Sequence, residues 1–305
     1  FSLSVESGAR YQTNANAGPS SALIRALGFD TTLPVTASRR RDGNAFALAS
    51  LGYIHDLGTP RGDVLEAQVT GFYARQFALH SLNTGLVEAS AGPRLMLGSA
   101  LPVWSLKPYA LAGFVTLGDW PYIAHGGGGL VAAMPMGHVL VEPGVEWRRR
   151  AFRSSTDQPT ATEQTGALTT SWVNVSGYLS ASLRWSARGF YQRNEAREPF
   201  NAYAAMGGDV GLAWQFEPPI LAEFGAWSVF SFAGMTQTAY DSPNPSVDPA
   251  VSRKDREWRV GTKLTMPIRT NGGLGLLVQY TRTGSNLPNF RMRNLAVTFG
   301  PTFRF

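Results

Sequence analysis

The chain contains no cysteine and, among its 305 residues, only three lysines. The absence of cysteine excludes disulfide bonds, thiolate metal sites and a cysteine nucleophile. Charged residues make up 16% of the sequence, compared with roughly 25% in an ordinary soluble domain. No run of about 18 residues lacks both charges and helix breakers, so the sequence predicts no transmembrane helix. A membrane-spanning β-barrel remains compatible with this composition, because its sequence signal is alternation rather than bulk hydropathy.

Intrinsic disorder is excluded as well, since 44% of the residues are hydrophobic and 11% are aromatic. The net charge of +6 comes almost entirely from arginine. The basic triplets Arg39–Arg41 and Arg148–Arg150 lie far apart and lack the interleaved aromatics of a nucleic-acid surface. We therefore expect no nucleic-acid partner. Arginine facing anionic lipid headgroups and lining a polar interior accounts for the charge.

Period-two alternation is the main pattern in the sequence. In segment 138–150 one face carries Val139, Val141, Val145 and Trp147, and the other carries Glu142, Gly144, Glu146 and Arg148. Segments 63–76, 170–183 and 257–266 repeat the pattern. The apolar face could be buried in the core of a soluble sandwich or exposed to lipid.

Residues that interrupt strands, such as glycine and proline, separate these segments and predict fourteen strands. The predicted strands are 2–12, 44–56, 63–76, 86–99, 104–117, 123–135, 138–151, 168–182, 184–194, 202–216, 225–239, 254–267, 274–283 and 291–305. Most span 10–15 residues, whereas strands of soluble sheets average about five or six. Tilted strands that cross a bilayer need about 9–11 residues. The strand length therefore favours a membrane barrel.

The predicted connections alternate between long and short. The longer, polar ones are 13–43, 77–85, 118–122, 152–167, 195–201, 240–253 and 284–290. The others are mostly tight: 57–62, 100–103, 136–137, 183, 217–224 and 268–273. This sorting is typical of outer-membrane barrels of Gram-negative bacteria. The sequence predicts an all-β fold, a 14-stranded antiparallel transmembrane β-barrel over residues 1–305, with both termini on the periplasmic, short-turn side.

Aromatic residues collect near the predicted strand ends, as in the girdles at the two membrane interfaces. On the loop side these are Tyr11, Tyr73, Trp120, Tyr122, Trp147, Trp172, Tyr191, Tyr203 and Trp258. On the turn side they are Trp104, Trp185, Trp214, Phe216, Phe303 and Phe305. The last strand carries Phe303 and ends on Phe305, and we interpret these two as a signal to the barrel assembly machinery. Outer-membrane lipids are the second expected partner.

No catalytic or metal-binding constellation is visible. The four histidines, His55, His80, His125 and His138, lack any metal-binding spacing. No histidine beside a serine has an evident orienting carboxylate. We therefore expect no enzyme activity, no metal and no cofactor, and interpret the histidines as interfacial polar residues.

Charged residues of both signs fall on the predicted inward face. They are Glu66, Glu88, Arg94, Glu142, Glu146, Arg148, Arg150, Arg188, Asp209, Glu257, Arg259 and Lys263. We predict that they line the lumen. This mixture of acidic and basic residues is compatible with three interiors. The residues could simply be polar groups in a water-filled lumen, or form a porin constriction with the two signs on opposite sides. They could also form cross-strand ion pairs in a plugged or gated interior.

The connection 13–43 is long enough to be functional. Within it, the segment from Ser20 to Gly28 predicts a short helix, with serine at its start and glycine at its end. Leu23, Ile24 and Leu27 would form its apolar face, with Arg25 beside them. We predict that this segment plugs the pore; the alternative is that it packs on a neighbouring loop.

Several segments resemble a known family. They are Gly8–Pro19, Ser105–Tyr109, Leu117–Asp119, Asp255–Gly261, Gln279–Arg282 and Ser285–Asn289. They resemble the C-terminal barrel of tetratricopeptide-repeat outer-membrane proteins of proteobacteria, and are similar to surface lipoprotein assembly modifiers (Slam). The resemblance implies a periplasmic repeat domain upstream of Phe1, which would make the sequence a piece of a longer protein. It also implies a barrel that passes a protein outward.

Three functions are compatible with these observations. The first is an outer-membrane export conduit that translocates or displays a protein or lipoprotein on the cell surface. The second is a polysaccharide-secretion porin of the same architecture, and the third is a general diffusion porin. The expected substrate is accordingly a secreted protein, a lipoprotein or a polysaccharide.

Overall fold

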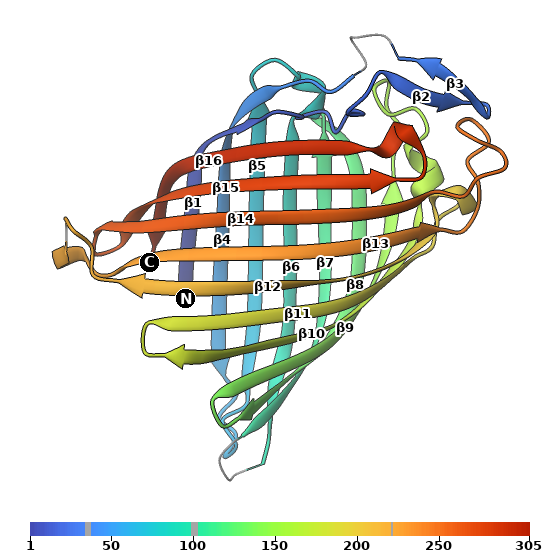
Figure 1. The fold of residues 1–305 in the computed structure, drawn as a ribbon. Helices are drawn as coiled ribbons and strands as arrows, with labels where there is room; N and C mark the ends of the chain where they lie inside the picture. Colours follow the sequence, from blue (N-terminus) through green and yellow to red (C-terminus); the bar gives the residue numbers. More distant parts are fainter. Residues whose placement is uncertain (34–37, 99–102, 221) are drawn as a thin grey trace.

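The computed structural model describes residues 1–33, 38–98, 103–220 and 222–305. Fourteen antiparallel strands close into a barrel in the order β1-β16-β15-β14-β13-β12-β11-β10-β9-β8-β7-β6-β5-β4. In Figure 1, β12–β16 cross in front of β4–β8 at a large angle, as tilted strands on opposite walls of a barrel do. The predicted fold class is confirmed.

The barrel strands are β1 (Ser2–Gln12), β4 (Asp42–Asp56), β5 (Val64–Gln76), β6 (Thr84–Leu97), β7 (Trp104–Leu117), β8 (Trp120–Met136), β9 (Val139–Phe152), β10 (Gly166–Ser180), β11 (Leu183–Asn194), β12 (Tyr203–Phe216), β13 (Trp227–Tyr240), β14 (Lys254–Arg269), β15 (Gly272–Ser285) and β16 (Met292–Arg304). All fourteen coincide with the predicted strands to within a few residues, because breakers and alternation mark both their ends and their faces.

Short 3₁₀ helices lie in the connections: η2 (His80–Leu82), η3 (Ala161–Gln164), η4 (Pro199–Asn201), η5 (Ala222–Phe224) and η6 (Pro288–Phe290). No helix in the described part of the chain is both long and apolar enough to cross a membrane.

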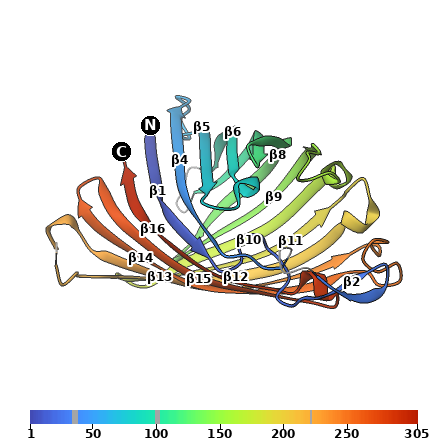
Figure 2. The same cartoon turned by 90° about the horizontal axis from the view of Figure 1, so that it is seen from above.

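Alternate residues of each strand face outward, and this outer surface is apolar. Val210, Val87 and Val260 are 61%, 54% and 53% exposed, although they are large hydrophobic residues. Few apolar side chains of the described residues are buried, so this part of the chain has no conventional hydrophobic core. Seen from above, the strands fan around a common interior (Figure 2).

Most of the aromatic residues predicted for the two girdles lie near strand ends on the outward face, but not all of them do. Tyr73, Trp147, Tyr191 and Trp258 are exposed on the outer surface near the loop end, as are Trp104 and Trp214 near the turn end. Tyr203, opposite Asn194, has inward parity and was assigned wrongly. Trp172 was assigned wrongly as well. It lies opposite Phe190 and within 5.8 Å of the Arg188 guanidinium, on the inward face. Even-numbered residues of β10, such as Thr170, face the interior, and Trp172 is one of them.

The long loops and short turns lie at opposite ends of the barrel. We call these the loop end and the turn end. Both termini lie at the turn end, where the backbones of Leu3 and Phe305 exchange hydrogen bonds of 2.8 and 2.9 Å. The strand parity predicted from the connections is therefore confirmed.

The seam between the first and last strands closes around two glycines. A Cβ on Gly300 would lie 1.8 Å from the backbone oxygen of Ser7, and one on Gly8 would lie 2.1 Å from that of Phe299. These approaches leave no room for a side chain at either position. Gly8 and Gly300 therefore permit the contact that closes the sheet.

The helix predicted from Ser20 to Gly28 is wrong. The segment instead forms a hairpin of β2 (Leu23–Ala26) and β3 (Phe29–Thr32). Its turn residues, Leu27 and Gly28, have φ values of +51° and +85°, as expected of a two-residue type I′ turn. A helix of nine residues gains little on its own, whereas the hairpin tip is held by hydrogen bonds from Leu27 and Gly28 to the backbone of loop 241–253.

Candidate functional site: the barrel interior

The inward face of the barrel carries clusters of paired charges. Side-chain contacts bring together nine of the twelve predicted lumen residues: Glu66, Glu88, Arg94, Glu146, Arg148, Asp209, Glu257, Arg259 and Lys263. The other three, Glu142, Arg150 and Arg188, occupy the same inward parity in β9 and β11. That these residues line a channel remains a prediction.

The largest cluster centres on Arg148 of β9. Its guanidinium lies 2.5 Å from Glu88 of β6 and 2.5 Å from Glu146 two residues earlier. His125 of β8 lies 2.8 Å from the same Glu88 carboxylate. The Tyr109 hydroxyl of β7 donates to Glu146 at 2.8 Å. One arginine thus bridges two carboxylates across four adjacent strands.

The glycine run 126–129 makes room for this cluster. A Cβ on Gly129 would lie 2.5 Å from the Tyr109 hydroxyl. Gly129 pairs with Glu146 in the ladder between β8 and β9, so the Tyr109 ring lies over a strand without a side chain at that point. The absence of a side chain lets Tyr109 reach Glu146 along the wall.

A second cluster joins Glu66 of β5 to two cations. Arg94 of β6 approaches one carboxylate oxygen at 2.6 Å, and Lys107 of β7 approaches the other at 2.7 Å. The Arg94 guanidinium also donates to the Ser105 hydroxyl at 3.2 Å. These side chains are at most 24% exposed, so solvent screens the pairs less than surface pairs.

A third cluster lies on the opposite wall. Arg259 of β14 binds the Asp209 carboxylate of β12, with a shortest distance of 2.7 Å, and lies 3.2 Å from Glu257. Lys263, further along the same face of β14, lies 3.1 Å from Glu6 of β1. This last pair spans the region of the closing seam.

The remaining predicted residues have different surroundings. Arg150 donates to the Asn194 side chain of β11. Glu142 lies opposite Asn174. The Arg188 guanidinium lies 5.8 Å from the Trp172 ring centre and 5.9 Å from that of Phe190, within the range of cation–π attraction. Nearby, Arg184 lies 5.8 Å from the Tyr178 ring centre. We call this part of the wall, formed by Trp172, Tyr178, Arg184, Arg188 and Phe190, the arginine–aromatic wall.

The inward clusters run along the wall rather than across the interior. Every side-chain ion pair between barrel strands in the described residues joins strands separated by at most two others. At the turn end the interior opens into a hollow of about 470 Å³, lined by Glu6, Lys263 and Phe224. The interior charges therefore do not tie the opposite walls together.

The residues predicted to plug the pore are at the rim of the loop end. Arg25 lies 3.0 Å from Asp248 and 3.0 Å from Asp30, and its backbone exchanges hydrogen bonds with Asn289. In Figure 1 the hairpin projects beyond the loop ends of β13–β16. Leu23 and Leu27 stay 48% and 67% exposed. The apolar burial expected to draw Leu23, Ile24 and Leu27 into the barrel is therefore incomplete, and the alternative of packing on neighbouring loops describes the contacts.

Sequence reasoning missed several inward residues. Lys107, Tyr109 and His125 belong to the clusters, and Glu6 pairs with Lys263. Alternation along β7 predicts that Lys107 and Tyr109 face inward, since both lie on the same face as Ser105 and Leu111. His125 was expected at the interface, but its ring is almost fully buried against Glu88.

The inward acids and histidines do not assemble as metal ligands. In the parts of the chain that the structure describes, no group of three or more histidine, aspartate and glutamate side chains could hold a metal ion. Each cluster of carboxylates described above already has arginine, lysine or histidine as its counter-charge. The arrangement is suited to an electrostatically balanced, wet interior.

No protein-family model matches the chain, and no curated protein matches it. Among solved structures it is similar to a bacterial polysaccharide outer membrane secretin, with 11% identity, a TM-score of 0.45 and coverage of 99% of this chain and 98% of that one. It is also similar to the outer membrane protein OpdK from Pseudomonas aeruginosa (8% identity, TM-score 0.45, coverage 100% and 99%). An anion-selective porin from Comamonas acidovorans gives 8% identity, a TM-score of 0.45 and the same coverage.

Proposed function

We propose that this protein is a channel of the Gram-negative outer membrane. The observation that carries the proposal is the opposite character of the two faces of one closed sheet. Large apolar side chains are exposed outside, while ion pairs and hydrogen-bonding groups lie inside. Lipid outside and water inside satisfy both faces, because closure pairs the backbone groups and the lumen hydrates the charges.

The proposed orientation puts the loop end outside the cell and both termini in the periplasm. The sorting of long loops and short turns supports it. Phe303 and Phe305, whose rings stack with centres 6.5 Å apart at the end of β16, are then the assembly signal. In intact cells an impermeant maleimide would label cysteine at Ser155 or Ser246, and would not label cysteine at Gly272. The reverse pattern would contradict the orientation.

Export of a protein or lipoprotein is the substrate proposal supported by the resemblance of the sequence segments to tetratricopeptide-repeat outer-membrane proteins. It requires an upstream periplasmic domain to deliver the substrate. The adjacent genes and the coding sequence before Phe1 test it directly, since a repeat domain and a neighbouring secreted protein are expected. A signal peptide immediately before Phe1 would favour a diffusion porin instead.

Polysaccharide passage is the second candidate, and the arginine–aromatic wall favours it. Aromatic faces stack on sugar rings, and guanidinium groups bind carboxylates in a bidentate manner. Arg184 and Arg188 are exposed to the interior, and neither forms a salt bridge within the described residues. An anionic glycan would find both kinds of contact on β10 and β11.

Single-channel recording in planar bilayers tests these proposals together. The wild-type protein should conduct ions, and a protein that folds and inserts without conducting would contradict the channel. Added oligomers of a uronic acid should block the current more strongly than neutral oligosaccharides of equal length. The variant Arg188→Gln should weaken that block, whereas Arg149→Gln, on the outward face, should leave it unchanged. Equal block by both oligosaccharides would exclude selection for anionic glycans.

A further inference from the structure

The outer surface of the barrel has a basic collar at the loop end. It consists of Arg75, Arg149, Arg193, Lys254, Arg256, Arg282 and Arg293, all at outward positions within three residues of the loop end of their strands. By register, every aspartate and glutamate of the described barrel strands has inward parity. The outward face therefore carries positive charge without acidic side chains of the same strands to balance it.

Most of the collar lies just above an aromatic ring of the outer surface. Tyr73, Trp147, Tyr191, Trp258 and Tyr280 occupy the outward position two residues nearer the barrel centre than an arginine of the collar, and they are 39–53% exposed. Aromatic rings of this kind lie at the level of lipid headgroups. The cations consequently lie where the phosphate groups of membrane lipids begin.

Three collar residues form a cluster on adjacent strands. Arg282 of β15 and Arg293 of β16 are directly opposite each other in the ladder, and Arg256 of β14 is diagonal to Arg282. Like charges at opposite positions destabilise a sheet. All three side chains are exposed, and none forms a salt bridge with any residue that the structure describes. Arg193, by contrast, is paired with Asp241 at 2.6 Å.

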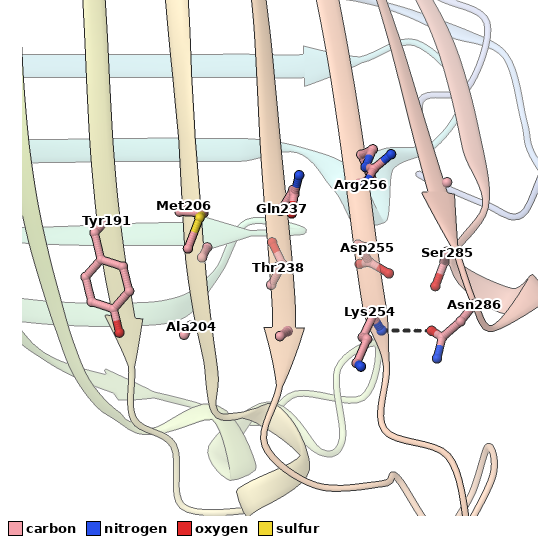
Figure 3. A pocket seen from close by; sticks show the side chains of 13 residues that line it. Tyr191, Ala204, Met206, Gln237, Thr238, Lys254, Asp255, Arg256, Ser285 and Asn286 are labelled. Carbon is pink, nitrogen blue, oxygen red and sulfur yellow. Dashed lines mark hydrogen bonds between the residues drawn. The ribbon is translucent and has the colours of Figure 1, made fainter.

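An apolar hollow lies beside this cluster on the same outer wall. It has a volume of about 580 Å³ and is lined by small residues, including Ala204, Ala239 and Gly284, together with polar ones such as Gln237 and Asn286. Figure 3 shows Tyr191 and Met206 on one side, and Lys254 and Arg256, two residues apart on one strand, on the other. The hollow thus places hydrocarbon-binding surface next to unpaired cations.

We infer that Arg256, Arg282 and Arg293, with Lys254, bind the phosphate of an outer-leaflet phosphorylated glycolipid, one of whose acyl chains occupies the hollow. The inference rests on the proposed membrane location. Guanidinium groups bind phosphate through paired, charge-assisted hydrogen bonds. A phosphate between Arg282 and Arg293 turns their repulsion into a bridged contact. The acyl chain covers the apolar part of the lining, so a phospholipid-type amphiphile matches the site better than a free anion.

Competition for a fluorescent diphosphoryl lipid A, bound to the purified barrel in non-ionic detergent, tests the inference. Unlabelled diphosphoryl lipid A should displace the probe at a concentration about tenfold or more below that of its phosphate-free form, since charge-assisted contacts are lost. Inorganic phosphate should fail to displace it even at roughly a hundredfold excess, because it lacks the linked acyl contact. Equal competition by the phosphate-free lipid, or by inorganic phosphate, would overturn the inference.

The triple variant Arg256→Gln, Arg282→Gln, Arg293→Gln should bind diphosphoryl lipid A about tenfold or more weakly. Its matched control removes the same charge at the turn end, with Arg61→Gln, Arg269→Gln and Arg304→Gln, and should bind as the wild type does. Equal losses of lipid affinity in both variants would show that binding depends on the net charge of the barrel and not on a site at the loop end. Should the triple variant fail to show the heat-dependent gel shift of a folded barrel, the comparison of lipids on the wild type still decides.

Conductance recorded on the same preparations separates the two proposals. A wild-type barrel that conducts but does not distinguish the two lipids contradicts the lipid site alone. A barrel that selects the phosphorylated lipid but does not conduct contradicts the channel and leaves the lipid site supported.

Discussion

Arg148 reaches from β9 to Glu88 on β6, with Nη1 2.5 Å from Oε2, although two strands lie between them. The same guanidinium holds Glu146 through Nε. A single guanidinium therefore contacts two inward carboxylates, and its removal would leave both of them without an arginine partner.

Removing that cation should change ion selectivity. In Arg148→Gln, Glu88 and Glu146 lose their shared partner and the lumen gains negative field, so the permeability ratio of potassium over chloride should rise roughly twofold or more. Reversal potentials in a salt gradient measure it. Arg149→Gln removes the same charge from the outward face and should leave the ratio unchanged. Equal effects from both variants would show that Arg148 does not face the conducting path.

The closing seam should tolerate no side chain at its glycines. Gly300→Ala places a Cβ against the Ser7 backbone, so β1 and β16 must separate locally and the folded, heat-modifiable fraction should fall. Gly71→Ala is the matched control, because a Cβ at that position would have no heavy atom within 4 Å. Gel mobility before and after boiling reports both. Normal folding of Gly300→Ala would mean that β1 and β16 do not approach each other so closely.

A charged side chain on the outward, apolar face of the barrel should lower the free energy of unfolding. Val260→Arg puts a guanidinium on an outward position, with a cost of roughly 2–4 kcal/mol near the bilayer midplane. Gln279→Arg, on the neighbouring strand but facing inward, should cost little. Urea-induced unfolding in lipid vesicles gives both free energies. A larger loss of unfolding free energy for Gln279→Arg than for Val260→Arg would show that the inward and outward faces are assigned the wrong way round.

The hairpin should detach from the rim in acid. Hydrogen bonds from the Ala250 backbone and from Arg25 keep the pKa of Asp248 below its ordinary value near 3.8. Ala250 belongs to the same loop as Asp248, so only the part of the lowering caused by Arg25 is linked to docking. That part stabilises docking above the ordinary value, and it is lost as the pH falls through the pKa in the docked state. The test is a double variant, Leu27→Cys with Ser246→Cys, which is incubated at a chosen pH and then oxidised rapidly. Its disulfide yield should therefore be high after incubation at pH 7.

The same pair should cross-link progressively less as the incubation pH falls further below about 3.8. The chain has no other cysteine, so the yield reports this contact alone. Asp248→Asn should lower the yield already at pH 7 and remove its pH dependence. An unchanged yield in acid would show that the Asp248–Arg25 contact does not hold the hairpin.

Most of the fold was predictable because strand alternation and loop parity are properties of local sequence. Trp172 lies near a strand end, which is typical of a girdle residue, but its parity in β10 places it on the inward face. The hairpin was missed because a nine-residue segment can satisfy a helix pattern, while its true partners, Ser246 and Asn289, are more than 200 residues away.

The interior clusters were only partly predictable for the same reason. Alternation indicates that Arg148 and Glu88 both face inward, but their contact depends on barrel curvature and on the glycines of β8. Within the described residues His125 pairs with the Glu88 carboxylate, and no spacing in the sequence links His125 to Glu88. Single residues could therefore be assigned to a face, while their partners required the register of all the strands.

Cysteine accessibility along β15 tests the central claim most directly. Single cysteines at Val278, Gln279, Tyr280 and Thr281 would be treated with a small hydrophilic maleimide in reconstituted vesicles. We predict labelling at Gln279 and Thr281, which face a water-filled lumen, and protection at Val278 and Tyr280, which face lipid. Protection at all four positions would contradict a hydrated lumen, and labelling at all four would contradict a lipid-covered outer face.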